Sequence, residues 1–68
     1  MNMRLESERK RRHWSRAELS RRTGMNPNTI YMIEKGKLSP FPGQVAKLAA
    51  AFGYPPDRAH ELFLEEEG

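Results

Sequence analysis

The sequence predicts an all-α fold, a compact set of five helices that together form a single domain over residues 1–68. Three observations predict it. Apolar residues recur at helical spacing, helix-start and helix-stop residues alternate along the chain, and no strand pattern is apparent. A domain of this size buries only about 60% of the surface of its unfolded chain, so its core is small and marginal.

The first of two central helices opens at Ser15, whose hydroxyl can accept a backbone N–H at Glu18. Glu18 can reach back in return, which completes the S-x-x-E capping box. Leu19 supplies an apolar residue on one face of this helix. Gly24 ends it, because a residue without a Cβ adopts a positive φ at little cost.

A second central helix is predicted from Pro27 to Lys35. Asn26 is a strong N-cap, and Pro27 suits the first turn, where its missing N–H has no partner to lose. Ile30 gives the helix an apolar face, and Gly36 is placed to terminate it. Two short helices joined by a Gly-bearing turn form a helix-turn-helix unit, here at about residues 16–35.

Three further helices are predicted around this unit, over residues 1–12, 44–52 and about 56–66. The Pro-rich loop 38–43 cannot be helical throughout, and residues 65–67 are expected to be a frayed, solvated end. The expected core residues are Leu5, Ile30, Ile33, Val45, Leu48, Ala49, Phe52, Ala59, Leu62 and Phe63.

The net charge of +3 conceals an asymmetry between the two parts of the chain. Through Lys37 there are ten Lys or Arg and four Glu, a balance of +6. From Leu38 onward two Lys or Arg face five Asp or Glu, a balance of −3. The amino-terminal part is therefore predicted to face a polyanion, although a charged surface alone is usually only solvated.

Several other functions find no support in the sequence. There is no cysteine and no long apolar run, so disulfides, cysteine metal sites, a membrane span and a secretory signal are not expected. His60 and Glu61 resemble the opening of a zinc H-E-x-x-H motif, but Leu64 stands where the second His belongs. No catalytic constellation, cofactor, metal or small-molecule ligand is predicted.

One group of residues matches the pattern of a known family in both residue type and spacing. It consists of Leu5, Arg9, Trp14, Ser15, Glu18, Leu19, Gly24, Met25, Thr29, Ile30, Ile33, Glu34, Lys35, Gly36, Lys37, Pro40, Leu48, Ala49, Phe52 and Gly53. Over Arg4 to about Leu62, the chain resembles the Cro/C1-type (Xre) helix-turn-helix domains, which are lambda-repressor-like. The resemblance implies a cytoplasmic, prokaryotic or phage-type regulator, a repressor that binds double-stranded DNA on the nucleoid as a homodimer.

The resemblance also implies the DNA-contacting residues, by position. The second central helix would present Pro27, Asn28, Tyr31 and Met32 to base edges in the major groove. An Asn28 amide can bond adenine bidentately, although a polar residue in a first helical turn also needs no such role. Tyr31 could instead bond a phosphate through its hydroxyl. The implied phosphate contacts are Ser15, Arg16, Thr29, Lys35 and Lys37.

Arg9 is implied to form a structural ion pair with Glu34. The run RKRR at residues 9–12 could also be a nuclear address or an RNA-binding tract, but with Arg9 turned inward we favour backbone-facing or solvated charge. His13 replaces a usual Gly and suggests a less sharply turned helix end. Trp14 is expected to fasten the first helix to the core, and a role in stacking on bases is a less favoured alternative.

The homodimer interface is expected near the last helix, at Tyr54, Phe63 and Leu64. The same residues could instead close the domain's own core. An alternative function belongs to another class, a protein-interaction module such as an antitoxin or adaptor on the same fold, because fold alone does not determine function.

Overall fold

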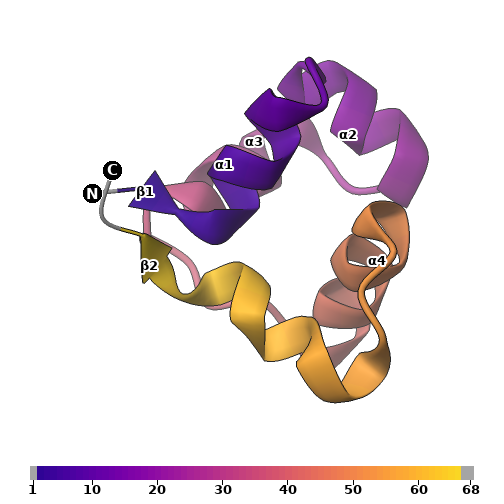
Figure 1. Ribbon diagram of the computed structural model, residues 1–68. Helices are drawn as coiled ribbons and strands as arrows, with labels where there is room; N and C mark the ends of the chain where they lie inside the picture. Colours follow the sequence, from indigo (N-terminus) through magenta and orange to yellow (C-terminus); the bar gives the residue numbers. More distant parts are fainter. Residues whose placement is uncertain (1, 67–68) are drawn as a thin grey trace.

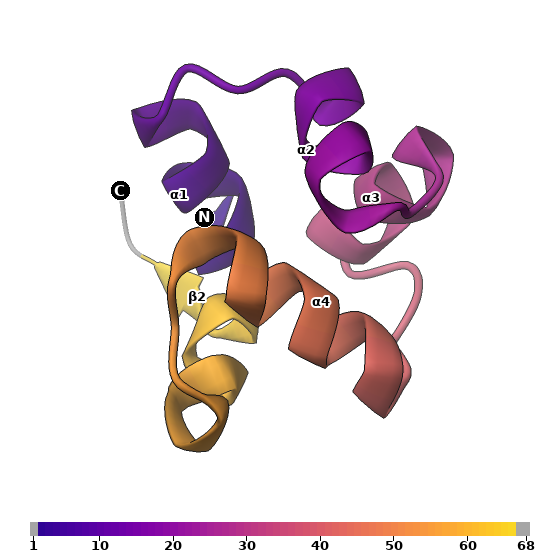
Figure 2. The ribbon, with the colours of Figure 1, turned by 90° about the vertical axis from the view of Figure 1, so that its right-hand side faces the viewer.

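The chain folds into four α-helices, one 3₁₀ helix and a two-stranded ribbon, as the computed structural model shows for residues 2–66 (Figure 1). The elements are β1 (Asn2–Met3), α1 (Arg4–Arg11), α2 (Arg16–Thr23), α3 (Pro27–Glu34), α4 (Pro42–Phe52), η1 (Pro56–Phe63) and β2 (Glu65–Glu66). Helices α2 and α3 pack together, and η1 packs against both α1 and α4 (Figures 1 and 2). The predominance of five helices confirms the predicted fold class.

The core is built from apolar side chains of every helix. Its buried members are Leu5, Leu19, Met25, Ile30, Ile33, Leu48, Ala49, Phe52, Ala59 and Leu62. Val45 and Phe63, which were predicted as core residues, are half-buried and pack against this cluster. Full burial of one large aliphatic side chain contributes about 1.5–3 kcal/mol, so these few residues fix how the helices are placed.

Helix α2 begins and ends at the predicted residues. The Ser15 Oγ accepts the Glu18 N–H at 3.0 Å, and Gly24 adopts a left-handed φ of 74°. The Glu18 carboxylate forms ion pairs with Arg21 and Arg22 in place of the predicted bond back to Ser15. The amino end of α2 is therefore fixed by its serine cap.

Helix α3 also follows the prediction closely. The Asn26 Oδ1 accepts the Asn28 N–H at 2.8 Å, and Pro27 occupies the first turn. The helix ends at Glu34, one residue earlier than expected, and Gly36 follows with a φ of 71°. The helix-turn-helix unit therefore lies where the capping residues place it.

The end of α1 is turned more sharply than predicted. His13 adopts a φ of 58°, a left-handed conformation that is uncommon for a residue with a side chain. The prediction of a less sharply turned end at His13 was wrong. The His13 N–H bonds the Lys10 carbonyl at 3.0 Å, and the Trp14 N–H bonds the Arg9 carbonyl at 3.1 Å. These two bonds satisfy carbonyls at the end of the helix and hold His13 in this conformation.

The absence of strands was also predicted wrongly, because β1 and β2 pair antiparallel with Met3 opposite Glu65. The first helix was expected from Met1 but begins at Arg4, and Met1 lies outside the described residues. The Arg4 N–H donates to the Leu64 carbonyl at 2.8 Å, and the Arg4 Nε bonds Glu66 at 2.9 Å. These contacts join the two ends of the described chain, so Glu65 and Glu66 are paired and do not form the expected frayed end. Glu67 lies outside the described residues.

The last two helices differ from their predicted bounds. Helix α4 begins at Pro42, two residues before the predicted Gln44, because Pro fits a first turn and the Gln44 Oε1 accepts the Phe41 N–H at 2.9 Å. The predicted last helix is the 3₁₀ helix η1 and ends at Phe63. Its extension to Glu66 was wrong, because Leu64 is extended and leads into β2.

Candidate nucleic-acid interface

One side of α3 is free of the core. Pro27 and Asn28 are exposed, and Tyr31 and Met32 are half-buried. Ile30 and Ile33, on the other side of the helix, are fully buried. The four residues expected to read bases therefore lie on the accessible face of α3.

A buried carboxylate joins three helices behind this face. Glu34, only 4% exposed, accepts hydrogen bonds from Arg9 of α1 at 2.7 and 3.2 Å. The same carboxylate accepts one from the Arg16 Nε of α2 at 3.0 Å. The structure thus brings Arg9 and Glu34 together, as the resemblance implied, and adds Arg16, which sequence reasoning assigned only to a phosphate. Because Arg9 is itself 6% exposed, its charge depends on Glu34 for compensation.

The other expected phosphate contacts lie around the helix-turn-helix unit. Ser15 is exposed at the start of α2, and its oxygen is already the acceptor of the α2 cap. Thr29 is half-buried in the first turns of α3. Lys35 and Lys37 are exposed beyond the end of that helix. All four can present a donor to the outside, since a hydroxyl that accepts a bond can still donate one.

The ring of Tyr31 has three cations around it. The Arg16 guanidinium carbon lies 4.9 Å from the ring centroid, and the amino nitrogens of Lys35 and Lys37 each lie 6.0 Å from it. Sequence reasoning missed this arrangement. Lys35 lies one helical turn after Tyr31, which is a usable signal, but the approach of Arg16 depends on how α2 crosses α3.

The positive balance of residues 4–37 survives ion pairing. Each of the four glutamates in this part of the chain forms ion pairs with two cations. Each such set of three side chains therefore has a net charge of +1. The sharing sets are Glu6 with Lys10 and Lys35, Glu8 with Arg11 and Arg12, Glu18 with Arg21 and Arg22, and Glu34 with Arg9 and Arg16. The surface around the helix-turn-helix unit thus keeps a net positive charge, which attracts a polyanion.

Two of these carboxylates are buried in α1 and have lowered pKa values. The hydrogen bond from Lys10 lowers the pKa of Glu6, against the opposing effect of burial. Burial raises the pKa of Glu8, but hydrogen bonds from Tyr54 and Arg12 outweigh it, and the pKa is lowered overall. Both groups therefore remain ionised and paired at neutral pH.

Trp14 connects the turn between α1 and α2 to α4. Its ring is stacked on Phe52 with the centroids 5.4 Å apart, and the Arg22 guanidinium lies 4.1 Å from the Trp14 centroid. Trp14 is half-buried and packs against the core. This arrangement matches the fastening role predicted for Trp14.

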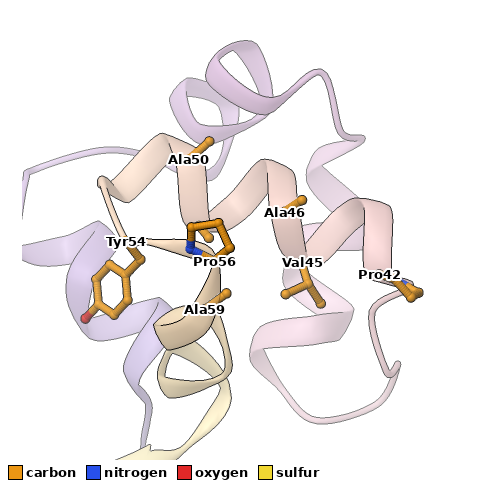
Figure 3. A pocket seen from close by; sticks show the side chains of 8 residues that line it. Pro42, Val45, Ala46, Ala50, Tyr54, Pro56 and Ala59 are labelled. Carbon is orange, nitrogen blue, oxygen red and sulfur yellow. The ribbon is translucent and has the colours of Figure 1, made fainter.

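A separate surface, which we term the α4–η1 groove, is almost entirely apolar (Figure 3). It has a volume of about 330 Å³ and is lined by Pro42, Val45, Ala46, Ala49, Ala50, Tyr54, Pro56 and Ala59. Phe41, directly before Pro42, is 70% exposed. The groove lies on elements other than α2 and α3.

The three residues expected at a dimer interface lie in different environments. Tyr54 lines the α4–η1 groove, and its hydroxyl donates to the Glu8 Oε2 at 2.6 Å. This hydrogen bond to Glu8, together with burial, raises the pKa of Tyr54. Phe63 is half-buried against the core, and Leu64 is 49% exposed. Tyr54 and Phe63 thus contribute to the domain's own packing, whereas Leu64 has a large free surface.

Across residues 2–66, no three His, Asp or Glu side chains gather where they could hold a metal ion. None of the described helices is long and apolar enough to span a membrane.

Two capped helices pack together, the second has an accessible face, and cations are in excess around both. These features define the class of helix-turn-helix DNA-binding domains. A helix-turn-helix family model, HTH_3, matches residues 5–58. The chain belongs to this family, the Cro/C1-type (Xre) helix-turn-helix domains of DNA-binding transcription regulators. No match was found among curated proteins or among solved structures.

Proposed function

We propose that the chain is a sequence-specific repressor that binds double-stranded DNA with α3 in the major groove. In this proposal residues 1–68 act as one domain in a prokaryotic or phage-type cytoplasm. Pro27, Asn28 and Met32 would contact bases, and Ser15, Arg16, Thr29, Lys35 and Lys37 would contact phosphates. The protein would need no enzymatic activity or cofactor for this function.

The observation that carries the proposal is the exposed amino end of α3 in a cationic setting. Asn28 is exposed in the first turn, where this class of helix meets base edges. Its amide can bond the N6 and N7 edge of adenine. Pro27 and Met32 can offer only apolar contact, such as to a thymine methyl group.

A test of this interface replaces the two lysines that follow α3. We expect the double variant Lys35→Gln/Lys37→Gln to bind all duplex sequences more weakly, because two phosphate contacts are removed. The slope of log affinity against log salt should become shallower by about 2. Fluorescence anisotropy with labelled duplexes at several salt concentrations measures both quantities.

Lys47→Gln is the matched control, because Lys47 is an exposed lysine on α4 and has no place in the proposed interface. It should leave affinity and slope unchanged. Equal effects of the two sets of changes would contradict the assignment of Lys35 and Lys37 and would indicate non-specific attraction to positive charge.

We further propose that the DNA-binding form is a homodimer, with the α4–η1 groove covered by a second copy. A two-fold interface requires one patch that is complementary to itself. The patch here has a hollow and, beside it at Pro42, the protruding Phe41 ring, so each copy could place its Phe41 in the groove of the other. The lining of the groove includes no charged residue, so two such faces can meet without charge repulsion.

The dimer can be tested with Ala46→Glu, which places a carboxylate in the groove lining. Because an uncompensated charge is costly to bury, we expect the variant to be monomeric at concentrations where the unaltered protein is dimeric. Light scattering after gel filtration measures the mass. Lys47→Glu, an exposed change on the same helix outside the lining, should remain dimeric. A dimeric Ala46→Glu variant would contradict the proposed surface.

The alternative, a protein-interaction module such as an antitoxin or adaptor, has one supporting observation. The α4–η1 groove and the exposed Phe41 and Leu64 could receive a different protein. If the unaltered protein shows no binding to any duplex at moderate salt, this alternative becomes the better account.

A further inference from the structure

The environment of Tyr31 differs from that of the other residues on the accessible face of α3. The Arg16 guanidinium of α2 and the amino groups of Lys35 and Lys37 all lie within 6.0 Å of the Tyr31 ring centroid. Aromatic rings attract cations through the negative potential of their faces. The ring therefore gathers side chains from α2, from the end of α3 and from the following turn into one positively charged cluster.

Arg16 is held from two sides in this cluster. Its Nε donates to the buried Glu34 carboxylate at 3.0 Å, while the Tyr31 ring lies 4.9 Å from its guanidinium carbon. The hydrogen bonds of the described residues use only the Nε of Arg16. Its two terminal amino groups thus remain for an outside acceptor, and a phosphate accepts from such a fork with good geometry.

Lys35 is restrained in a similar way. Its amino group lies 3.6 Å from the Glu6 carboxylate and 6.0 Å from the Tyr31 centroid. Lys37 forms no ion pair among the described residues. The three cations lie around one ring with only Glu34 and Glu6 to compensate them, so a phosphate would offset their excess positive charge.

We propose that Tyr31 is a positioning residue for phosphate binding, which orients Arg16, Lys35 and Lys37 toward one strand of the DNA backbone, and that it does not read a base. This inference rests on the proposed DNA-binding function. Because long cationic side chains surround the Tyr31 ring, Tyr31 is a poorer candidate for a base contact than the exposed Asn28. The ring restrains the three long side chains before DNA is bound. They therefore lose less conformational entropy when they bind.

The experiment compares Tyr31→Leu with Tyr31→Phe. Tyr31→Leu removes the ring, and we expect it to weaken binding to a specific site and to an unrelated duplex by the same factor, about three- to tenfold. Its slope of log affinity against log salt should become shallower. Tyr31→Phe keeps the ring and loses only the hydroxyl, so its affinity and slope should match those of the unaltered protein.

Three outcomes would overturn the inference. Equal losses in Tyr31→Phe and Tyr31→Leu would assign the effect to the hydroxyl. A loss confined to the specific site, with relaxed preference at one base pair and an unchanged slope, would make Tyr31 a base reader. An unchanged Tyr31→Leu would show that the ring has no role. Absence of duplex binding by the unaltered protein is a different result and would overturn the proposed function itself.

A double-mutant cycle with Arg16→Gln keeps the test valid if Tyr31→Leu destabilises the fold. If the ring acts partly through Arg16, the losses in affinity from Arg16→Gln and Tyr31→Leu should be non-additive, with the double variant losing less than the sum of the two single losses. The melting temperature of each variant separates loss of fold from loss of binding. Additive losses in folded variants would show that the two residues act independently.

Discussion

Replacing Glu34 with alanine is expected to lower the free energy of unfolding by about 3–5 kcal/mol, because the change leaves a buried charge without its partner. The stranded charge is Arg9, which is 6% exposed and donates two hydrogen bonds to this carboxylate. Arg16 loses its restraint in the same substitution. Urea unfolding followed by circular dichroism measures the effect.

Glu18→Ala is the matched control for this prediction. Glu18 also forms ion pairs with two arginines, but its partners Arg21 and Arg22 are exposed. Ion pairs at the surface contribute about 0–1 kcal/mol, so the control should lose far less stability. Similar losses in the two variants would show that the burial of the Arg9–Glu34 pair has no special importance.

A variant that removes both partners of the buried pair separates pairing from burial. Arg9→Met/Glu34→Leu replaces the pair with apolar side chains, and it should recover much of the stability lost in Glu34→Ala. If Glu34→Ala is too unstable to study, the double variant and Arg9→Met still bracket the effect. A double variant less stable than either single variant would contradict this account of the pair.

The central part of the fold could be predicted from local chemistry. Ser15 and Asn26 start helices by accepting backbone N–H groups, and Pro27 suits a first turn because it lacks an N–H. Gly24 and Gly36 end helices by adopting a positive φ. Neighbouring residues alone therefore determine these bounds. The ends of the chain could not be predicted in this way. The β1–β2 ribbon joins residues more than sixty positions apart, and no short-range signal in Asn2–Met3 or Glu65–Glu66 specifies that pairing.

His13 shows a different limit of sequence reasoning. A residue with a Cβ at a helix end usually indicates a gentler turn than glycine, but the bonds to the Lys10 and Arg9 carbonyls hold His13 at a φ of 58°. Tertiary packing of Trp14 against Phe52 immediately after the turn supports the same geometry. Local preference was outweighed by the contacts that follow it.

The candidate site was predictable in its residues more than in its connections. Family position implied the pairing of Arg9 with Glu34 and the exposure of Asn28, and the structure shows both geometries. The attachment of Arg16 to Glu34 and its approach to the Tyr31 ring depend on how α2 crosses α3. Spacing along one helix cannot reveal a contact between two helices, so both features required the structure.

Asn28→Ala is expected to cost about 1–3 kcal/mol in discrimination at one base pair, because the variant would lose the proposed bidentate contact to adenine. The asparagine amide is exposed, and only its backbone N–H is used in the cap by Asn26. Its removal should leave the fold intact and binding to unrelated duplexes unchanged. Lys37→Ala serves as the comparison, since the loss of a phosphate contact should weaken binding uniformly without altering preference.

The most direct test of sequence-specific binding is selection of binders from a randomised DNA duplex pool at near-physiological salt, with the unaltered protein and Asn28→Ala in parallel. We predict a two-fold motif with half-sites about 34 Å apart, one per subunit, and relaxed preference at one adenine in the variant. Specific sites should bind at least about 10³-fold more tightly than unrelated duplexes. A pool with no enriched motif, retained only through salt-sensitive attraction, would contradict the account.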